Sequence, residues 1–414
     1  MIPPAPPLWS ILLALLAVHV AGMGGFLTVP VLAPAIAAET GLPASLAGLH
    51  TGLVYAGALV TGPMTGPLIR RWGGVRVLQG GLLLVGLGIA LAALAHPLAL
   101  ALSAFVAGLG HGPVTPGSSH LVAARTPPRR RALVFSLKQC GVPLGAMVVA
   151  ASAPLIANHA GWRAGVLTMA AAAFLVAFAM QPLRAALDAE RDPAAGRAGS
   201  RAILREAAAS LAMLRRDPAL ARLTVMASAY GITQFCFSTF FVAFQVTGLG
   251  VPLAEAGLRL AIAQAGGVAG RIGWALLADR FGARPVLVLC GAGTLVATLA
   301  LAAAGMDWPG MGWPGMDWPG MDWPGMVVLG AGLLMGITAV GWNGVMLAEA
   351  ARLAPAGQVG AATSALSFCF GATMLVAPPL FSVLIGVTEG YSAGFLMCAM
   401  AALVGTVAIA GSRR

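Results

Sequence analysis

Two basic side chains inside apolar segments are the residues of this sequence best placed to do chemistry. Lys138 is the only lysine in the chain, and Arg271 lies at a similar depth in a second apolar run. A charge near the centre of a bilayer costs about 2.5–3.5 kcal/mol, so it normally faces a bundle interior or a wet cavity. No acidic residue lies deep in either run to neutralise these charges. Snorkelling to the headgroups, or a purely structural ion pair, remains open for each cation.

Uncharged polar residues in the apolar runs are further candidates for contact with a solute. We expect them to be substrate-binding residues, or else to hydrogen-bond between helices, a contact worth about 1 kcal/mol in membranes. They are Gln139, Gln234, Trp342 and Asn343.

Titratable groups within the predicted helices could carry a coupling proton. Histidine changes charge near neutral pH, and His111 is our candidate among the histidines, although a core histidine bonded to a neighbour is the alternative. Glu349 is a second candidate for proton coupling, but it precedes Arg352 by three residues, which favours a structural ion pair.

Composition assigns the chain to the membrane. Hydrophobic residues make up 59% of the sequence and charged residues only 9%, whereas soluble domains carry roughly 25% charged residues. A spanning helix needs about 20 mostly apolar residues. Twelve runs meet that requirement, over residues 9–37, 44–68, 77–95, 98–123, 132–157, 163–182, 223–247, 254–277, 285–305, 326–350, 358–386 and 392–411.

The positions of the basic residues predict the topology. If the N-terminus is cytoplasmic, all but four of the 24 Lys and Arg residues fall in cytoplasmic segments, as the positive-inside rule requires. Both termini are then cytoplasmic. The net charge of +11 is explained by topology and gives no support to nucleic-acid binding.

A polar segment over residues 183–222 separates the first six runs from the last six. It contains a predicted amphipathic helix at 200–214 with Ser200 as its cap. We interpret the segment as a linker on the inner membrane surface. A regulatory role is the alternative. The predicted domains are therefore residues 1–182, residues 183–222 and residues 223–414.

An internal repeat supports two related halves. Arg71 and Arg280 occupy matching places in two short polar turns, as do Gly73 and Gly282, and the two pairs have the same spacing. Residues 306–325 interrupt the second half with four Met-Asp/Gly-Trp-Pro-Gly pentapeptides. Proline at every fifth residue forbids a helix. We predict an extracytoplasmic loop that is a tolerated insertion, with a ligand-gripping lid as the alternative.

These features together resemble the major facilitator superfamily of transporters. The turn after the second helix of each half resembles the family motif Gly-x-Leu-Ala-Asp-Arg/Lys-x-Gly-Arg/Lys. The second copy fits closely, while the first has Arg70 in place of the Asp. The resemblance implies an all-α membrane protein of 12 transmembrane helices in two pseudo-symmetric six-helix bundles. It also implies a cytoplasmic gate at these turns, whose residues are Gly66, Arg71, Gly73, Asp279, Arg280, Gly282 and Arg284.

The resemblance also suggests where the cations meet. In this family helices five and eight face one another across the interface of the halves, which would place Lys138 and Arg271 in one cavity. Two uncompensated positive charges in one cavity would favour an anionic substrate. The segment 138–145 is similar to helix five of bacterial permeases for small anions. The fourth helix lacks the basic residue that many proton-coupled members carry, which is why His111 is considered. The resemblance further implies a monomer in the bacterial inner membrane.

Catalytic and cofactor motifs are missing from the sequence. Its glycine-rich stretches lack the Gly-Lys-Ser/Thr ending of a phosphate loop, and no Cys or His spacing indicates a disulfide framework or metal site. We therefore predict that the protein is not an enzyme and needs no cofactor. It is expected to be a secondary transporter that works by alternating access and moves a small anion, with possible proton coupling. Drug or metabolite efflux is the alternative within transport, and a non-transporting membrane receptor or scaffold is the alternative outside it.

Overall fold

The computed structural model describes most of the 414 residues. Those outside its description are residues 1–5, 127–130, 190, 193, 195–207, 209–210, 307–322, 356–357 and 412–414. The described residues form helices joined by turns, with no strand among them. Twelve helical segments within this part are long and apolar enough to cross a membrane. The predicted all-α, twelve-span class is therefore confirmed.

The first half of the chain contributes six of the spanning segments, several of which are broken into two helices. Their bounds are α1 Leu8–Thr40, α2 Ala47–Thr61, α3 Thr65–Trp72, α4 Gly74–Ala92, α5 Pro97–His111, α6 Val114–Arg125, α7 Arg131–Gln139, α8 Gly141–Ala160, α9 Trp162–Ala179 and α10 Arg184–Leu187. A short 3-10 turn, Ala44–Leu46, leads into α2, and another, Gln181–Leu183, precedes α10.

The second half contributes the other six segments. Their bounds are α12 Pro218–Ala243, α13 Leu253–Phe281, α14 Ala283–Ala304, α15 Trp323–Met335, α16 Asn343–Leu353, α17 Val359–Thr388 and α18 Ser392–Ala410. Two π-helical turns extend this set, Phe244–Gly248 after α12 and Gly336–Val340 after α15.

Proline positions explain why several spans are broken. Proline lacks a backbone N–H and cannot complete the helical hydrogen bond to the residue four positions earlier. Pro116 follows the break between α5 and α6, and Pro143 follows the break between α7 and α8. The sequence predicts 44–68 as one continuous helix, but α2 ends at Thr61 and α3 begins at Thr65, with Gly62 and Pro63 between them.

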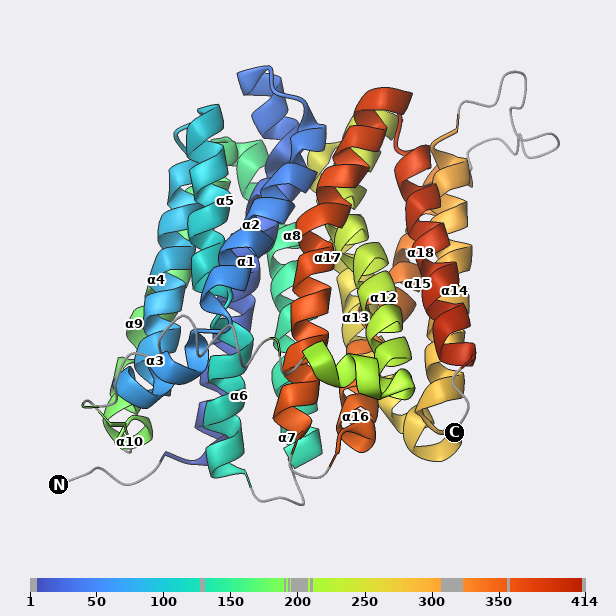
Figure 1. Ribbon diagram of the computed structural model, residues 1–414. Helices are drawn as coiled ribbons and strands as arrows, with labels where there is room; N and C mark the ends of the chain where they lie inside the picture. Colours follow the sequence, from blue (N-terminus) through green and yellow to red (C-terminus); the bar gives the residue numbers. More distant parts are fainter. Residues whose placement is uncertain are drawn as a thin grey trace.

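The helices form two bundles that meet along a common interface (Figure 1). At that interface α8 packs against α13, and α2 packs against α17. These are the fifth and eighth, and the second and eleventh, spans. We call the side on which α1 begins and α18 ends the terminal face; it is the lower edge of Figure 1. The side on which α1 and α17 end is the opposite face.

Two predicted features fall largely outside the description. Most of the amphipathic helix expected at 200–214 lies among residues that the structure does not describe, and so does most of the pentapeptide insertion at 306–325. Both remain predictions from sequence. The domain boundaries at 182 and 222 likewise remain predictions.

Candidate functional site

Lys138 lies near the end of α7, fully enclosed by protein. Its side chain has 0% exposure, so it does not snorkel to the surface. The ammonium donates hydrogen bonds to Ser119 Oγ at 2.7 Å and to Ser118 Oγ at 3.2 Å, both on α6. It also lies 5.4 Å from the ring centroid of Phe135. The ammonium also lies 3.5 Å from the carbonyl oxygen of Thr115, so its contacts are with hydroxyls, one backbone carbonyl and an aromatic face.

Arg271 reaches from α13, in the second half, to the backbone of the first. Its side chain is 7% exposed, and its Nη1 donates to the carbonyl oxygen of Gln139 at 2.9 Å. In a regular helix that carbonyl would accept from the N–H of residue 143, but residue 143 is proline. The sequence thus frees a backbone acceptor where α7 gives way to α8, and Arg271 binds it.

The two cations lie in one neighbourhood beside α1. Lys138 is joined to His19 of α1 through Ser118, and Arg271 binds the carbonyl of Gln139, the residue after Lys138. Among the described residues the ion pairs are Glu39–Arg163, Glu255–Arg259 and Glu349–Arg352. None of them involves Lys138 or Arg271. The cluster therefore has positive charge with no carboxylate paired to it.

The uncharged candidates occupy different places. Gln139 is half-buried, and its side-chain oxygen has no partner among the described residues. Gln234 on α12 accepts a hydrogen bond from Asn343 on α16 at 3.0 Å. Trp342 is fully buried, donates its indole N–H to Ala339 and packs edge-on against Tyr230. Trp342 is thus part of the core of the second half, and we leave it out of the proposed site.

The two candidate proton carriers, His111 and Glu349, also have different contacts. His111 is half-buried, with Nδ1 3.3 Å from the carbonyl oxygen of Gly22. Glu349 forms an ion pair with Arg352 at 2.6 Å, the structural pair that its spacing favours. Sequence reasoning missed His19, which is 2% exposed and lies beside Ser118. Its position in the first apolar run carried no distinguishing pattern, and only the packing of α6 against α1 shows its partner.

The two halves are closed against each other toward the opposite face. Thr51 and Thr239 share a hydrogen bond at 3.0 Å between α2 and α12. The hydroxyl of Ser382 donates to the carbonyl of Ser45. At Gly48 a Cβ atom would overlap the carbonyl oxygen of Pro378, so the backbones of α2 and α17 touch only because this residue is glycine.

The first copy of the turn motif lies between α3 and α4. Gly73 has φ +94° and ψ 156°, a region that is essentially restricted to glycine. Gly66 is exposed on α3 and Arg71 is half-buried. Arg70 occupies the position where the family motif has Asp. Its backbone carbonyl accepts a hydrogen bond from the N–H of Asp192 at 2.8 Å.

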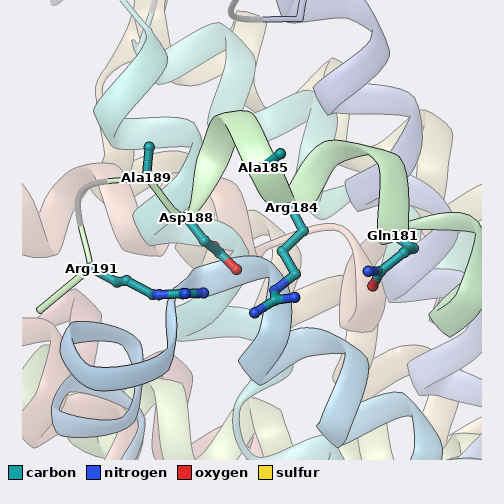
Figure 2. A pocket seen from close by; sticks show the side chains of 6 residues that line it. All are labelled: Gln181, Arg184, Ala185, Asp188, Ala189 and Arg191. Atoms are coloured by element: carbon teal, nitrogen blue, oxygen red, sulfur yellow. The ribbon is translucent and has the colours of Figure 1, made fainter. Parts of the chain in front are cut away.

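A carboxylate from after α10 caps the helix that follows this turn. Asp188 accepts from the N–H groups of Val75 at 2.9 Å and Arg76 at 3.1 Å. Figure 2 shows its side chain between those of Arg184 and Arg191, beside a cavity of about 310 Å³. Burial raises the pKa of Asp188 above its usual value, since removal from water penalises the charged form. The chain thus places an acidic group at this turn from outside the motif.

The second copy of the motif lies between α13 and α14, and no side chain in the described part of the protein caps α14. Gly282 has φ +87°, and a Cβ there would meet nothing within 4 Å. Asp279 is exposed and makes no hydrogen bond or ion pair among the described residues. Arg280 lies over the ring of Phe281, and Arg284 donates to the carbonyl of Ala410. The two turns share a backbone shape but differ in their contacts.

The same architecture occurs among known proteins. The model of the Major Facilitator Superfamily matches residues 14–346. The chain belongs to this family. It is accordingly a multi-pass membrane protein, and the resemblance drawn from the turn motif is confirmed.

Two curated proteins resemble this one in sequence. An uncharacterized MFS-type transporter of Mycobacterium tuberculosis is 28% identical over 303 residues, 72% of this chain and 64% of the relative. The chain therefore spans less than two thirds of the length of that relative. A putative metabolite transport protein of Haemophilus influenzae is 27% identical over 283 residues, 66% of this chain and 69% of the relative.

Solved structures of the superfamily share the fold over nearly the whole chain. The nucleoside transporter NupG has a TM-score of 0.72 at 12% identity, covering 98% of this chain and 99% of its own. The xylose transporter XylE from E. coli has a TM-score of 0.71 at 13% identity, covering 97% and 96%. At this level of identity the likeness shows the fold alone.

Proposed function

We propose that this member of the Major Facilitator Superfamily is a secondary transporter that moves a small anionic solute by alternating access. We further propose that it acts as a monomer in a bacterial inner membrane, with the terminal face toward the cytoplasm. The observation that carries the anionic assignment is the pair of buried cations, Lys138 and Arg271, with no carboxylate paired to either among the described residues. An uncompensated buried charge is costly, and a bound anion would supply the missing partner.

The hydrogen-bonding state of Arg271 supports direct contact with the solute. A guanidinium has five N–H donors arranged to bind carboxylate or phosphate in a bidentate manner. One nitrogen of Arg271 is used on Gln139, while its Nε is buried without a partner among the described residues. The side chain of Lys138 is directed toward α6 in this conformation, where it binds Ser118 and Ser119, and it adds positive charge near Arg271 without a free donor of its own for the solute. We therefore assign Arg271 as the principal anion contact.

The closed opposite face supports alternating access. In this mechanism the two halves rock about a site near their interface. The contacts Thr51–Thr239 and Ser45–Ser382 hold the halves together on one side of the cation cluster. A transporter must break these contacts to admit solute from that side.

The named substrates of the solved relatives do not fix the solute. One of these relatives is a nucleoside transporter and another is a xylose transporter. The same fold therefore serves chemically different substrates. The anionic assignment therefore depends on the charges of this chain.

Charge placement also disfavours the efflux alternative. Efflux of a cationic drug would be expected to use a buried, unpaired carboxylate. Among the described spanning segments Glu39, Glu255 and Glu349 lie near helix ends, each paired with an arginine. A receptor or scaffold role predicts binding without exchange across the membrane, which the following experiment also tests.

Counterflow in proteoliposomes tests the proposed function. Vesicles loaded with unlabelled lactate, succinate, phosphate or sulfate are placed in the matching radiolabelled anion, and uptake is followed over time. We expect uptake of at least one anion by the wild type and its loss in Lys138→Ala and Arg271→Ala. Arg259→Ala is the matched control, since Arg259 lies on the same helix as Arg271 but is paired with Glu255. Wild-type vesicles inactive toward all four anions, or normal uptake in both cation variants, would contradict the proposal.

A further inference from the structure

A continuous chain of hydrogen-bonding groups joins Lys138 to His19. Lys138 Nζ lies 3.2 Å from Ser118 Oγ, and Ser118 Oγ lies 3.4 Å from His19 Nε2. At the far end, His19 Nδ1 lies 2.8 Å from the carbonyl oxygen of Leu15. All three side chains are buried, with exposures of 0% for Lys138, 0% for Ser118 and 2% for His19. These hydrogen bonds link α7 to α1 through α6.

The carbonyl of Leu15 fixes the tautomer of His19. A carbonyl oxygen can only accept, so Nδ1 at 2.8 Å must carry a hydrogen. In the neutral imidazole the other nitrogen, Nε2, then has a lone pair directed at Ser118. The hydroxyl of Ser118 can donate to that lone pair while its oxygen accepts from Lys138. Each of the three side chains, Lys138, Ser118 and His19, then has a hydrogen-bond partner on the next.

Ser118 has a second acceptor that permits the opposite arrangement. Its hydroxyl lies 3.0 Å from the carbonyl oxygen of Thr115 on its own helix. If His19 carries a proton on Nε2, it donates to Ser118 Oγ, and the hydroxyl hydrogen turns to Thr115. The amine of Lys138 keeps Ser119 as an acceptor at 2.7 Å. The same atoms therefore satisfy their hydrogen bonds with the proton at either end.

The surroundings favour one shared proton over two separate ones. Among the described residues, the charged and titratable groups near this hydrogen-bonded chain include Arg271 on α13, which binds the carbonyl of Gln139, His111 on α5, which lies against Gly22 of α1, and Cys140 before α8. On α6 the neighbouring His120 is exposed, and on α16 Glu349 is bound to Arg352. Arg271 is already positive, so adding a second proton to the Lys138–His19 pair would increase repulsion among buried cations.

We propose that Lys138, Ser118 and His19 form the proton-binding relay of this transporter, in which one proton is shared between the amine and the imidazole. In the transfer step an N–H bond of the Lys138 ammonium breaks and an O–H bond to Ser118 forms. The original O–H bond of Ser118 breaks as an N–H bond forms at His19 Nε2. The products are a neutral amine and an imidazolium, and the total number of protons is unchanged. The inference deepens the proposed function and rests on it for the link to solute.

The backbone ties this relay to the anion contact. Lys138 directly precedes Gln139, whose carbonyl binds Arg271. An anion held by Arg271 would stabilise positive charge on the nearer member of the relay. Binding and release of the anion would therefore alter whether the shared proton resides on Lys138 or on His19. A carboxylate is not required for this coupling, in keeping with the lack of one at the cluster among the described residues.

The single lysine makes the relay directly observable. Protein labelled with 15N-lysine gives one side-chain Nζ signal, which can be followed by NMR over a pH titration in nanodiscs. Two interacting groups titrate in shared steps, so we expect the wild-type signal to move in two steps and the His19→Gln signal in one. His120→Gln, at the exposed histidine of α6, is the matched control and should retain two steps. Curves of the same shape in all three proteins would overturn the relay, and this readout needs no substrate.

A transport measurement separates coupling from structure. For the anion that gives counterflow, the ratio of proton-gradient-driven accumulation to counterflow is measured in each variant. We expect this ratio to fall to the level seen without a gradient in His19→Gln and Ser118→Ala, and to stay at the wild-type value in His120→Gln and in Ser152→Ala on α8. An unchanged ratio in both relay variants overturns the proposal. If the wild type shows no counterflow, the proposed function fails, and the lysine titration still decides the relay.

Discussion

Arg271 on α13 donates a hydrogen bond to the backbone carbonyl of Gln139 at the end of α7, at 2.9 Å. This contact joins the two halves of the protein through an acceptor that exists because residue 143 is proline. A side-chain partner could be exchanged for another residue, but the free carbonyl is a property of the helix break. The position of Arg271 therefore depends on the sequence of the other half.

Replacing Pro143 with alanine should weaken transport without touching either cation. The new alanine supplies an N–H that competes with Arg271 for the carbonyl of Gln139, and it favours a continuous helix across the break. A hydrogen bond to a charged group contributes about 1.5–3 kcal/mol. We therefore expect the apparent affinity for the anion to fall roughly tenfold or more. Concentration-dependent counterflow in proteoliposomes measures this change.

Pro34→Ala provides the control for loss of a helical proline. Pro34 lies within α1 and is buried, and no side chain among the described residues takes the carbonyl of Pro30, four residues earlier. Affinity in Pro34→Ala should stay close to that of the wild type. If Pro143→Ala binds the anion as tightly as the wild type does, Arg271 does not need the Gln139 carbonyl to hold its position.

Three glycines of the turn motifs should respond differently to alanine. Gly66 lies in a helix with open space around it, so Gly66→Ala should be neutral. At φ +87°, Gly282→Ala introduces backbone strain of about 1–3 kcal/mol. Gly73→Ala adds to similar strain an overlap with the side chain of Asp188, and should be the most destabilising. Thermal unfolding of purified protein in one detergent ranks the three midpoints.

The double variant Gly73→Ala with Asp188→Gly isolates the contribution of the overlap. Removing both the Cβ and the carboxylate of Asp188 opens space for the new Cβ at residue 73, although α4 loses its cap. The two substitutions should therefore cost less together than the sum of their separate effects, as expected for residues in contact. Strictly additive effects would show that Gly73 is constrained by its backbone angles alone.

The sequence predicted more of the fold than of the site. Twelve apolar runs and the repeated turn were sufficient for the membrane class and the two related bundles, because lipid demands long apolar helices whatever their packing. The depth of Lys138 and Arg271 also predicted that they avoid lipid. Periodicity carries no information on lateral partners, however. The capping of α4 by Asp188 and the contact of Ser118 with His19 join residues about a hundred positions apart, and each depends on how the helices pack.

Closure of the opposite face should depend on Gly48. A Cβ at this residue would overlap both the carbonyl of Pro378 and the hydroxyl of Ser382, so Gly48→Ala should hold α2 and α17 apart and stall alternating access. We expect counterflow to be lost and a cysteine placed at Ser382 to react faster with an impermeant maleimide applied from that side. Gly386→Ala on α17, where a Cβ meets nothing within 4 Å, should change neither rate. If Gly48→Ala transports normally with unchanged labelling, the close approach of these helices is not needed for the closed state, because the backbone would have moved aside at little cost.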